Sequence, residues 1–283
     1  MNRQPDGTPP DYLIIGHITK DQIEGGYRPG GTALYSGLLA HRMGQSVAIY
    51  TSGASNLALD ILEGIEIIDQ PSSGTTTFIN EYTSSGRVQR LLDRADELDI
   101  RQIPAGWKRA KIIHLAPVAR EVSPAAAKDL PDRFLGFSLQ GWMRGWDESG
   151  LISPSPLPEF TPPKRENGIG FLSIEDLGND RSGLDRIQRQ FPDLLLTLGS
   201  KGVELHSGGR TRRIPAPSTV EVDPTGAGDI FAAAFMICHR IMGKSAEESA
   251  RLANALAAAS VQAPGVEGIP KEWKINEIIK VQK

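Results

Sequence analysis

Short apolar runs recur along the chain and alternate with polar turns and with longer segments of helical spacing. Runs of four to six residues rich in Ile, Leu and Val are typical of strands buried on both faces of a parallel sheet. Such strands are predicted at 12–15, 47–50, 65–68, 112–115, 134–139, 170–174 and 194–198. Helices are predicted at 32–43, 56–62, 230–242, 245–262 and 271–280. This alternation predicts one α/β domain with a mainly parallel sheet and helices on both faces.

Two segments have a different pattern, with strand-forming residues of mixed polarity. Residues 75–91 predict a hairpin, because a Thr-rich β run is followed by a Ser-Ser-Gly turn and a second run. Residues 22–28 predict a further short strand, and both segments are expected to project from the core. Residues 1–10 are expected to form a flexible tail, and residues 153–164 a proline-rich loop inside a single domain that spans 11–283.

Composition and charge narrow the classes of function. The 283 residues are 39% hydrophobic and 23% charged, and the net charge of −3 offers no basic surface for nucleic acid. No apolar stretch reaches the roughly 18 residues of a membrane span. The single cysteine, Cys238, lies in an apolar segment and predicts a core residue in a reducing, cytoplasmic protein. His114, on an apolar strand, is predicted to be a core histidine.

The stretch 222–229 carries the clearest candidate chemistry. Gly226 and Gly228 follow a β-branched run at 219–222 and precede an apolar helix, so a strand, a glycine turn and a helix start are predicted in succession. Uncovered N–H groups at a helix start form an anion site. The helix dipole is expected to keep the first-turn carboxylate, Asp229, ionised. The same residues also suit a plain tight turn with an Asp cap.

The string Asp223-Pro-Thr-Gly-Ala-Gly-Asp229 resembles the C-terminal signature of the ribokinase-like (PfkB) carbohydrate kinases. The resemblance implies a ribokinase-like three-layer α/β/α sandwich with a mainly parallel central sheet and a small β lid, formed by the segments near 22–28 and 75–91. It also implies that Asp229 is the general base and that the amides of Gly226, Ala227 and Gly228 form the anion hole.

The same resemblance implies an acceptor side, a nucleotide side and a metal position. Gly30-Gly31 resembles the family's N-terminal signature, although Tyr35 replaces the usual Asn, and Arg144 keeps the family's spacing while Gln140 and Trp142 depart from it. The implied acceptor residues are Gly30, Gly31, Tyr35 and Arg144. Asp21, in the polar turn after the predicted strand 12–15, and Arg120, past the end of the strand 112–115, are further acceptor candidates, because ligands bind at the carboxyl ends of parallel strands. The implied nucleotide residues are Thr197, Gly199, Lys201, Gly202, Thr225, Asn254 and Ala258. Asp176 or Glu175 is expected to hold magnesium through water.

The resemblance thus predicts an ATP-dependent, Mg²⁺-assisted kinase for a small sugar or polyol, with an inositol or the acceptor of an uncharacterised sugar kinase preferred to ribose. A nucleoside kinase and a non-catalytic sugar or nucleotide sensor of the same fold are alternatives. A dinucleotide-binding oxidoreductase would need Gly-x-Gly-x-x-Gly after the first strand, where Gly16 is followed by His17-Ile18 instead. The protein is expected to be a monomer or a homodimer, with no membrane or nucleic-acid partner.

Overall fold

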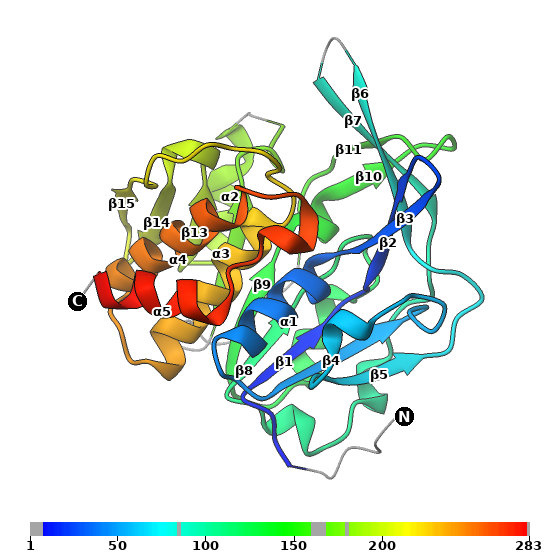
Figure 1. Cartoon of the computed structure of the whole chain (residues 1–283), viewed down its shortest axis with the longest axis horizontal. Helices are drawn as coiled ribbons and strands as arrows, with labels where there is room; N and C mark the ends of the chain where they lie inside the picture. Colours follow the sequence, from blue (N-terminus) through cyan, green and yellow to red (C-terminus); the bar gives the residue numbers. More distant parts are fainter. Residues whose placement is uncertain (1–7, 84–85, 160–167, 179–180, 282–283) are drawn as a thin grey trace.

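The computed structural model describes residues 8–83, 86–159, 168–178 and 181–281 (Figure 1). Residues 1–7 of the predicted tail and 160–164 of the predicted loop therefore lie outside the described residues.

A nine-stranded sheet forms the centre of the fold, in the order β15-β14-β13-β12-β9-β8-β1-β4-β5. All neighbours from β13 to β5 are parallel, whereas β14 and β15 turn back antiparallel at one edge. The strands are β1 (Tyr12–Ile15), β4 (Val47–Ser52), β5 (Glu66–Gln70), β8 (Ile112–Leu115), β9 (Phe134–Ser138), β12 (Gly168–Ser173), β13 (Leu194–Thr197), β14 (Val203–Ser207) and β15 (Arg210–Ile214). The chain runs outward from β1 to β5 and then resumes at β8 on the other side of β1. The strand order therefore reverses at β1, the kind of position where ligands bind at the carboxyl ends of strands.

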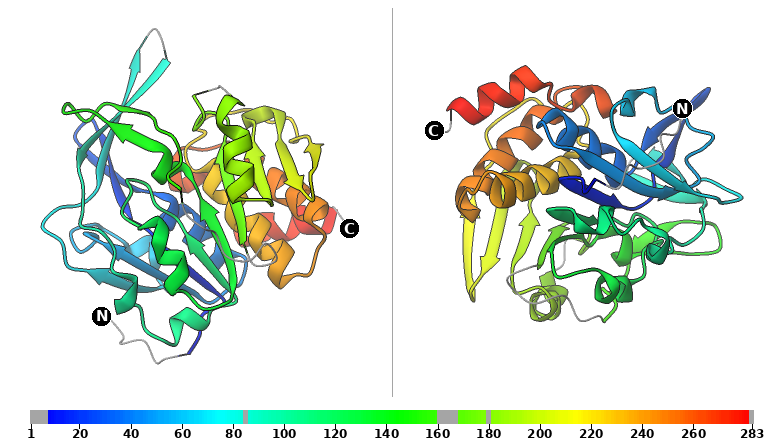
Figure 2. Two further views of the ribbon diagram at one scale, coloured as in Figure 1. Left: turned by 180° about the vertical axis from the view of Figure 1, so that it is seen from behind. Right: turned by 90° about the horizontal axis from the view of Figure 1, so that it is seen from below.

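Helices cover both faces of this sheet (Figure 2). One face carries α1 (Thr32–Arg42), α3 (Ala227–Met236), α4 (Ala246–Ser260) and α5 (Glu272–Val281), which share one apolar cluster with the sheet. The other face carries α2 (Leu184–Gln190) and short 3₁₀ turns, packed in a second cluster that includes Trp107 and Trp142. The predicted α/β/α sandwich with a mainly parallel sheet is confirmed.

A separate four-stranded sheet lies beside the large one, in the order β3-β2-β6-β7 (Figure 1). Its strands are β2 (Thr19–Ile23), β3 (Gly26–Gly30), β6 (Thr77–Thr83) and β7 (Gly86–Asp93). Two antiparallel hairpins are joined by the parallel pair β2 and β6. The strands cover the two segments predicted to project from the core, but the first segment is a hairpin rather than one strand. A short hairpin of β10 (Arg144–Trp146) and β11 (Ile152–Pro154) lies next to β7.

The predictions for two core residues and for one short helix can be compared with the structure. His114 is a core residue as predicted: it is fully buried and its ring nitrogens bond to the Tyr12 hydroxyl (3.0 Å) and the Ser138 hydroxyl (2.8 Å). Cys238 is buried. The predicted helix at 56–62 is wrong, because only a 3₁₀ turn at Asp60–Leu62 forms. Within the described ranges, the protein contains no helix that is both long and apolar enough to cross a membrane.

Candidate active site

The turn before α3 differs from the predicted strand, turn and helix. Residues 219–222 form no strand, because the N–H groups of Val222 and Asp223 both donate to the Val261 carbonyl at the end of α4 (2.7 and 3.1 Å) instead of pairing with a strand. Gly226 is left-handed (φ 79°), and α3 begins directly after it at Ala227. A loop anchored on α4 therefore replaces the strand, while the glycine turn and the helix start are as predicted.

The N–H groups of this turn are not equivalent. Ala227 donates to the Pro224 carbonyl (3.1 Å), so its amide is engaged within the turn. For the amides of Gly226 and Gly228, the part of the chain that the structure describes supplies no acceptor. The space around a side chain at Gly228 is open, whereas a methyl group at Gly226 would overlap the Tyr35 ring. Of the three amides, those of Gly226 and Gly228 are therefore the candidate donors for an anion.

Asp229 lies in the first turn of α3 and is half-buried. Burial raises the pKa of its carboxyl to about 6, although the Thr32 hydroxyl bonded to it and the Arg144 charge act in the opposite direction. The sequence predicted an ionised carboxylate here, and a carboxyl with a pKa of about 6 is still mostly ionised at pH 7, although loss of solvent raises its pKa. A carboxylate with a pKa near 6 is suited to accept a proton at neutral pH.

Three charged side chains from distant parts of the chain act on Asp229. Asp176 and Asp21 raise its pKa and Arg144 lowers it. Arg144 donates to the Val118 carbonyl (3.0 Å) and its guanidinium lies over the Phe78 ring, 5.2 Å from the centroid. The structure thus brings together three of the predicted site residues, Asp21, Arg144 and Asp176, around the predicted base.

Asp21 does not lie in a turn after β1, as its sequence position suggested; it belongs to β2 of the small sheet. Its carboxylate lies against Gly30, where an added Cβ would come within 2.5 Å of Oδ2. Gly31 is left-handed (φ 91°), and a Cβ there would meet the His17 carbonyl at 2.6 Å. Gly31 is therefore required for the close approach of β2, β3 and the start of α1, whereas a side chain at Gly30 would displace the Asp21 carboxylate.

Tyr35 and Arg120 take positions that the sequence does not show. Tyr35 is only 4% exposed and its ring packs on Gly226, so it supports the glycine turn. Burial, together with the nearby carboxylates, raises the Tyr35 pKa. Arg120 is exposed, its guanidinium lies over Trp146 (5.4 Å) and bonds to Ser155 (2.9 Å), and its backbone is left-handed (φ 58°).

The two candidate metal residues differ in environment. Asp176 is half-buried and accepts from the Ser173 N–H (2.8 Å) and from Gln140 (3.2 Å); burial raises its pKa. Glu175 is exposed, although its charge acts on Asp176. In the described ranges, no three His, Cys, Asp or Glu side chains are grouped so that they could hold a metal alone. A cation here would need oxygen ligands from water or substrate, as Mg²⁺ commonly has.

The predicted nucleotide residues lie at the β13–β14 end of the sheet and near α4. Lys201 is exposed and, with Leu198 and Arg213, lines a cavity of about 340 Å³. Gly199 (φ 59°) and Gly202 (φ 93°) shape this turn, and Thr197 reaches the Leu172 carbonyl (3.4 Å). The Ala258 side chain on α4 is half-buried. These positions form an edge separate from the acceptor residues.

Two other predicted nucleotide residues make internal bonds. Asn254 is buried, and its side chain donates to the carbonyls of Ile214 and Pro215 (3.1 and 3.2 Å). The Thr225 N–H donates to Asp223, whose other carboxylate oxygen accepts from Gly265 (2.9 Å each). Asn254 therefore fixes the end of β15, and Asp223 links the glycine turn to the loop after α4.

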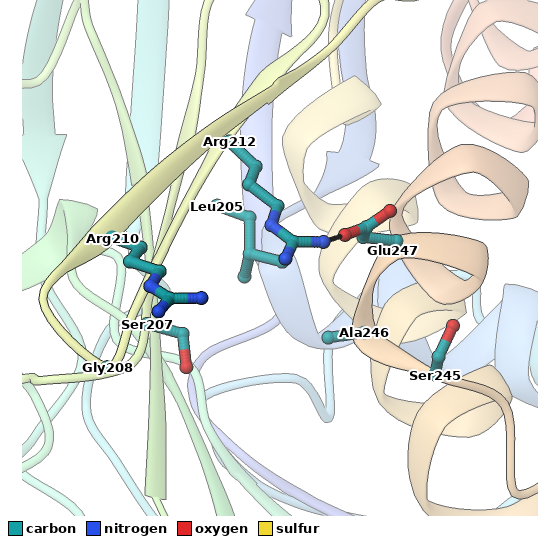
Figure 3. Close-up of a pocket in the computed structure, with 8 residues that line it drawn as sticks. All are labelled: Leu205, Ser207, Gly208, Arg210, Arg212, Ser245, Ala246 and Glu247. Atoms are coloured by element: carbon teal, nitrogen blue, oxygen red, sulfur yellow. Dashed lines mark ion pairs between the residues drawn. The ribbon is translucent and has the colours of Figure 1, made fainter.

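A larger cavity, of about 620 Å³, lies elsewhere, between β14, β15 and α4 (Figure 3). Arg210 and Arg212 reach into it from β15, and Arg212 pairs with Glu247 of α4. It contains none of the predicted site residues, so cavity size alone does not locate the site.

Thr32 is the functional candidate that the sequence did not reveal. Its side chain is 2% exposed and its hydroxyl bonds to the Asp229 carboxylate. Its only sequence signal is its place directly after Gly30-Gly31.

Comparisons with known proteins assign this chain to a family of kinases. Residues 177–273 match the model of the pfkB family of carbohydrate kinases. An inositol 3-kinase from Zea mays is 30% identical over 207 residues, which is 69% of this chain and 53% of that protein. The alignments span about half or less of the length of the curated relatives that the chain matches first.

Two solved structures share the fold over almost their whole length. A pyrophosphate-dependent kinase of the ribokinase family, complexed with a pyrophosphate analog and myo-inositol, has a TM-score of 0.72 at 20% identity, covering 90% of this chain and 96% of that one. Ribokinase from Arabidopsis thaliana, complexed with ribose and ATP, has a TM-score of 0.69 at 17% identity, covering 96% and 99%. This chain belongs to the ribokinase-like PfkB family of carbohydrate kinases.

Proposed function

We propose that this chain is a kinase that transfers the terminal phosphoryl group of ATP to a hydroxyl group of a small sugar or polyol. The observation that carries this proposal is the half-buried Asp229, within one turn of the N–H groups of Gly226 and Gly228. A base beside an anion site suits deprotonation of a hydroxyl while charge develops on phosphorus. Family membership and the ATP-bound Arabidopsis relative support the same function.

In this mechanism the acceptor hydroxyl oxygen attacks the terminal phosphorus and the bond from phosphorus to the ADP oxygen breaks. Asp229 takes the hydroxyl proton as the new oxygen–phosphorus bond forms. The amides of Gly226 and Gly228, at the positive end of α3, face the charge that develops on the phosphoryl oxygens. The Ala227 amide, engaged with Pro224, contributes by fixing the turn.

The small sheet is proposed to act as a lid within a single kinase domain. Asp21 of β2 accepts hydrogen bonds from acceptor hydroxyls, and the Gly30-Gly31 turn lets the acceptor approach the backbone. Closing this sheet over the acceptor would exclude water and limit hydrolysis of ATP. A kinase with one buried cysteine suits the reducing cytoplasm.

The acceptor is proposed to be an inositol or a related polyol. The maize relative and the myo-inositol complex support this class. Tyr35 also occupies the position of the Asn that is expected for a ribose-like acceptor. The test is a panel of inositols, sugars and nucleosides with ATP and magnesium, scored for acceptor-dependent ADP release, with pyrophosphate as a second donor scored by phosphate release. Turnover of ribose or fructose well above that of inositols would contradict the acceptor class. If no acceptor in a broad panel were phosphorylated with either donor, the alternative of a non-catalytic sugar or nucleotide sensor would be favoured.

The pH dependence of turnover follows from the Asp229 pKa of about 6. A protonated carboxyl cannot accept the hydroxyl proton, so kcat/KM should rise with pH through a midpoint near 6 and fall as the pH drops below it. The measurement is kcat/KM from pH 4.5 to 9, with circular dichroism to confirm that the protein stays folded. A flat profile between pH 5 and 7 would contradict this assignment.

The magnesium proposal rests on the donor set around Asp176. When bound, Mg²⁺ would neutralise charge on the donor phosphates, and Asp176 would hold it through water. Asp176→Asn should raise the Mg²⁺ concentration for half-maximal activity by about tenfold, since second-shell changes typically weaken metal affinity 10–100-fold. The matched control is Glu175→Gln, which removes the neighbouring exposed charge and should change that concentration little. A larger effect in Glu175→Gln would assign the role to Glu175.

A further inference from the structure

Two hydroxyl side chains near the start of α1 contact Asp229 in the first turn of α3. Thr32 is the first residue of α1, and its buried hydroxyl bonds to the Asp229 side chain. Ser36 lies one turn later, and its hydroxyl donates to the Asp229 backbone carbonyl (3.1 Å). One face of α1 therefore contacts Asp229 at its side chain and at its main chain.

Tyr35 completes this face. Residues 32, 35 and 36 have the i, i+3, i+4 spacing that places side chains on one side of a helix. The Tyr35 ring fills the space where Gly226 has no side chain, and its hydroxyl lies 3.7 Å from the Cβ position of Gly265. We call Thr32, Tyr35 and Ser36 the α1 clamp, since they contact both the base and the glycine turn.

The clamp is continuous with the acceptor side. Thr32 directly follows Gly31, and the neighbouring Gly30 lies against Asp21 of the small sheet. The segment that approaches the acceptor therefore also sets the position of the Thr32 hydroxyl.

We propose that Thr32 is a positioning residue for the phosphoryl-transfer reaction, whose hydroxyl selects the Asp229 rotamer that turns one carboxylate oxygen toward the acceptor. An ionised carboxylate has two oxygens and several acceptor sites, so one oxygen can receive the Thr32 donor while the other receives the acceptor proton. Thr32 suits this task because a β-branched, buried side chain has few alternative rotamers. The inference rests on the proposed function of Asp229.

The test compares Thr32→Val, which keeps the shape and removes the hydroxyl, with Thr32→Ser, which keeps the hydroxyl. Thr32→Val should lower kcat about tenfold or more, with acceptor KM little changed, because a hydrogen bond to a charged group is lost. It should also move the acidic limb of the pH profile, which is the rise of kcat/KM with pH near 6, to higher pH. The reason is that the Thr32 bond lowers the Asp229 pKa and valine cannot make this bond. Thr32→Ser should stay within about threefold of the natural enzyme.

Ser36→Ala is the matched control, because Ser36 contacts the Asp229 carbonyl and not its carboxylate; it should leave the acidic limb in place. A purely structural role of Thr32 would lower Tm without moving that limb. Equal losses in Thr32→Val and Thr32→Ser, or an unmoved limb in Thr32→Val, would overturn the proposal.

A titration of the Asp229 carboxyl by ¹³C NMR, assigned with Asp229→Asn, measures the same coupling without turnover. A higher pKa in Thr32→Val supports the positioning role, and an unchanged pKa overturns it. Failure of the proposed function is a separate result: it would show as near-normal turnover of Asp229→Asn itself.

Discussion

Replacing Asp229 by Asn is expected to lower kcat for phosphoryl transfer by about 10²–10⁴-fold, while the affinity for ATP changes little. The amide has nearly the same shape and can still bond to Thr32, but it cannot accept the acceptor proton. The nucleotide edge at Thr197 to Gly202 belongs to β13 and the turn after it, so it should be unaffected. Single-turnover kinetics and calorimetric ATP binding measure the two quantities.

Protein stability provides the internal control for this variant. The Asp229 pKa is about 6 in the folded protein against 3.8 ordinarily, so folding favours the protonated form. Ionisation of Asp229 therefore reduces the stability of the fold progressively as the pH rises from about 4 to about 6. Asp229→Asn removes that effect, and its Tm at pH 8 should equal or exceed that of the natural protein. Near-normal turnover would remove Asp229 from the mechanism.

The elements that the sequence predicted best are those with purely local signals. Apolar runs such as 112–115 and 194–198 are strands within a residue of their predicted bounds, and a capping box of Ser245 and Glu248 starts α4 where the helix at 245–262 was predicted to begin. Hydrophobic period and capping act over a few residues, so a single sequence contains the necessary information. The predicted strand at 219–222 was wrong because the N–H groups at its end, those of Val222 and the following Asp223, bond to Val261, a partner about forty residues away.

The site also contains residues that a local sequence motif reveals and residues that only the fold brings together. The glycine turn and Asp229 form a contiguous string, and a string can be recognised. Thr32 could not be recognised, since its role depends on a contact with a residue almost two hundred positions later; the Ser36 bond to Asp229 spans 193 residues. Tyr35 was predicted on the acceptor side, but its packing against Gly226 could not be predicted, because the two residues are far apart in the sequence.

Gly226→Ala is expected to have the second large effect, lowering kcat by about 10²–10³-fold, the loss typical of one anion-hole donor. Gly226 has a φ of 79°, where a Cβ costs about 1–2 kcal/mol, and the added methyl group would overlap the Tyr35 ring. The ring is held within the α1 clamp, so the turn itself must shift and its amides move with it. Steady-state kinetics below the variant's Tm measure the loss.

Replacing a second glycine of the same turn, Gly228, tests whether the effect of Gly226→Ala comes from strain or simply from the loss of a glycine. Gly228 lies in α3 with open space around its Cβ position, so Gly228→Ala should have an equal or higher Tm, because Ala favours a helix by up to about 1 kcal/mol. Gly226→Ala should instead have a lower Tm. Adding Tyr35→Leu should restore part of that Tm, since it removes the overlap but leaves the backbone strain. If Gly226→Ala alone kept natural turnover and Tm, the Tyr35 ring would not control the position of the anion-hole amides.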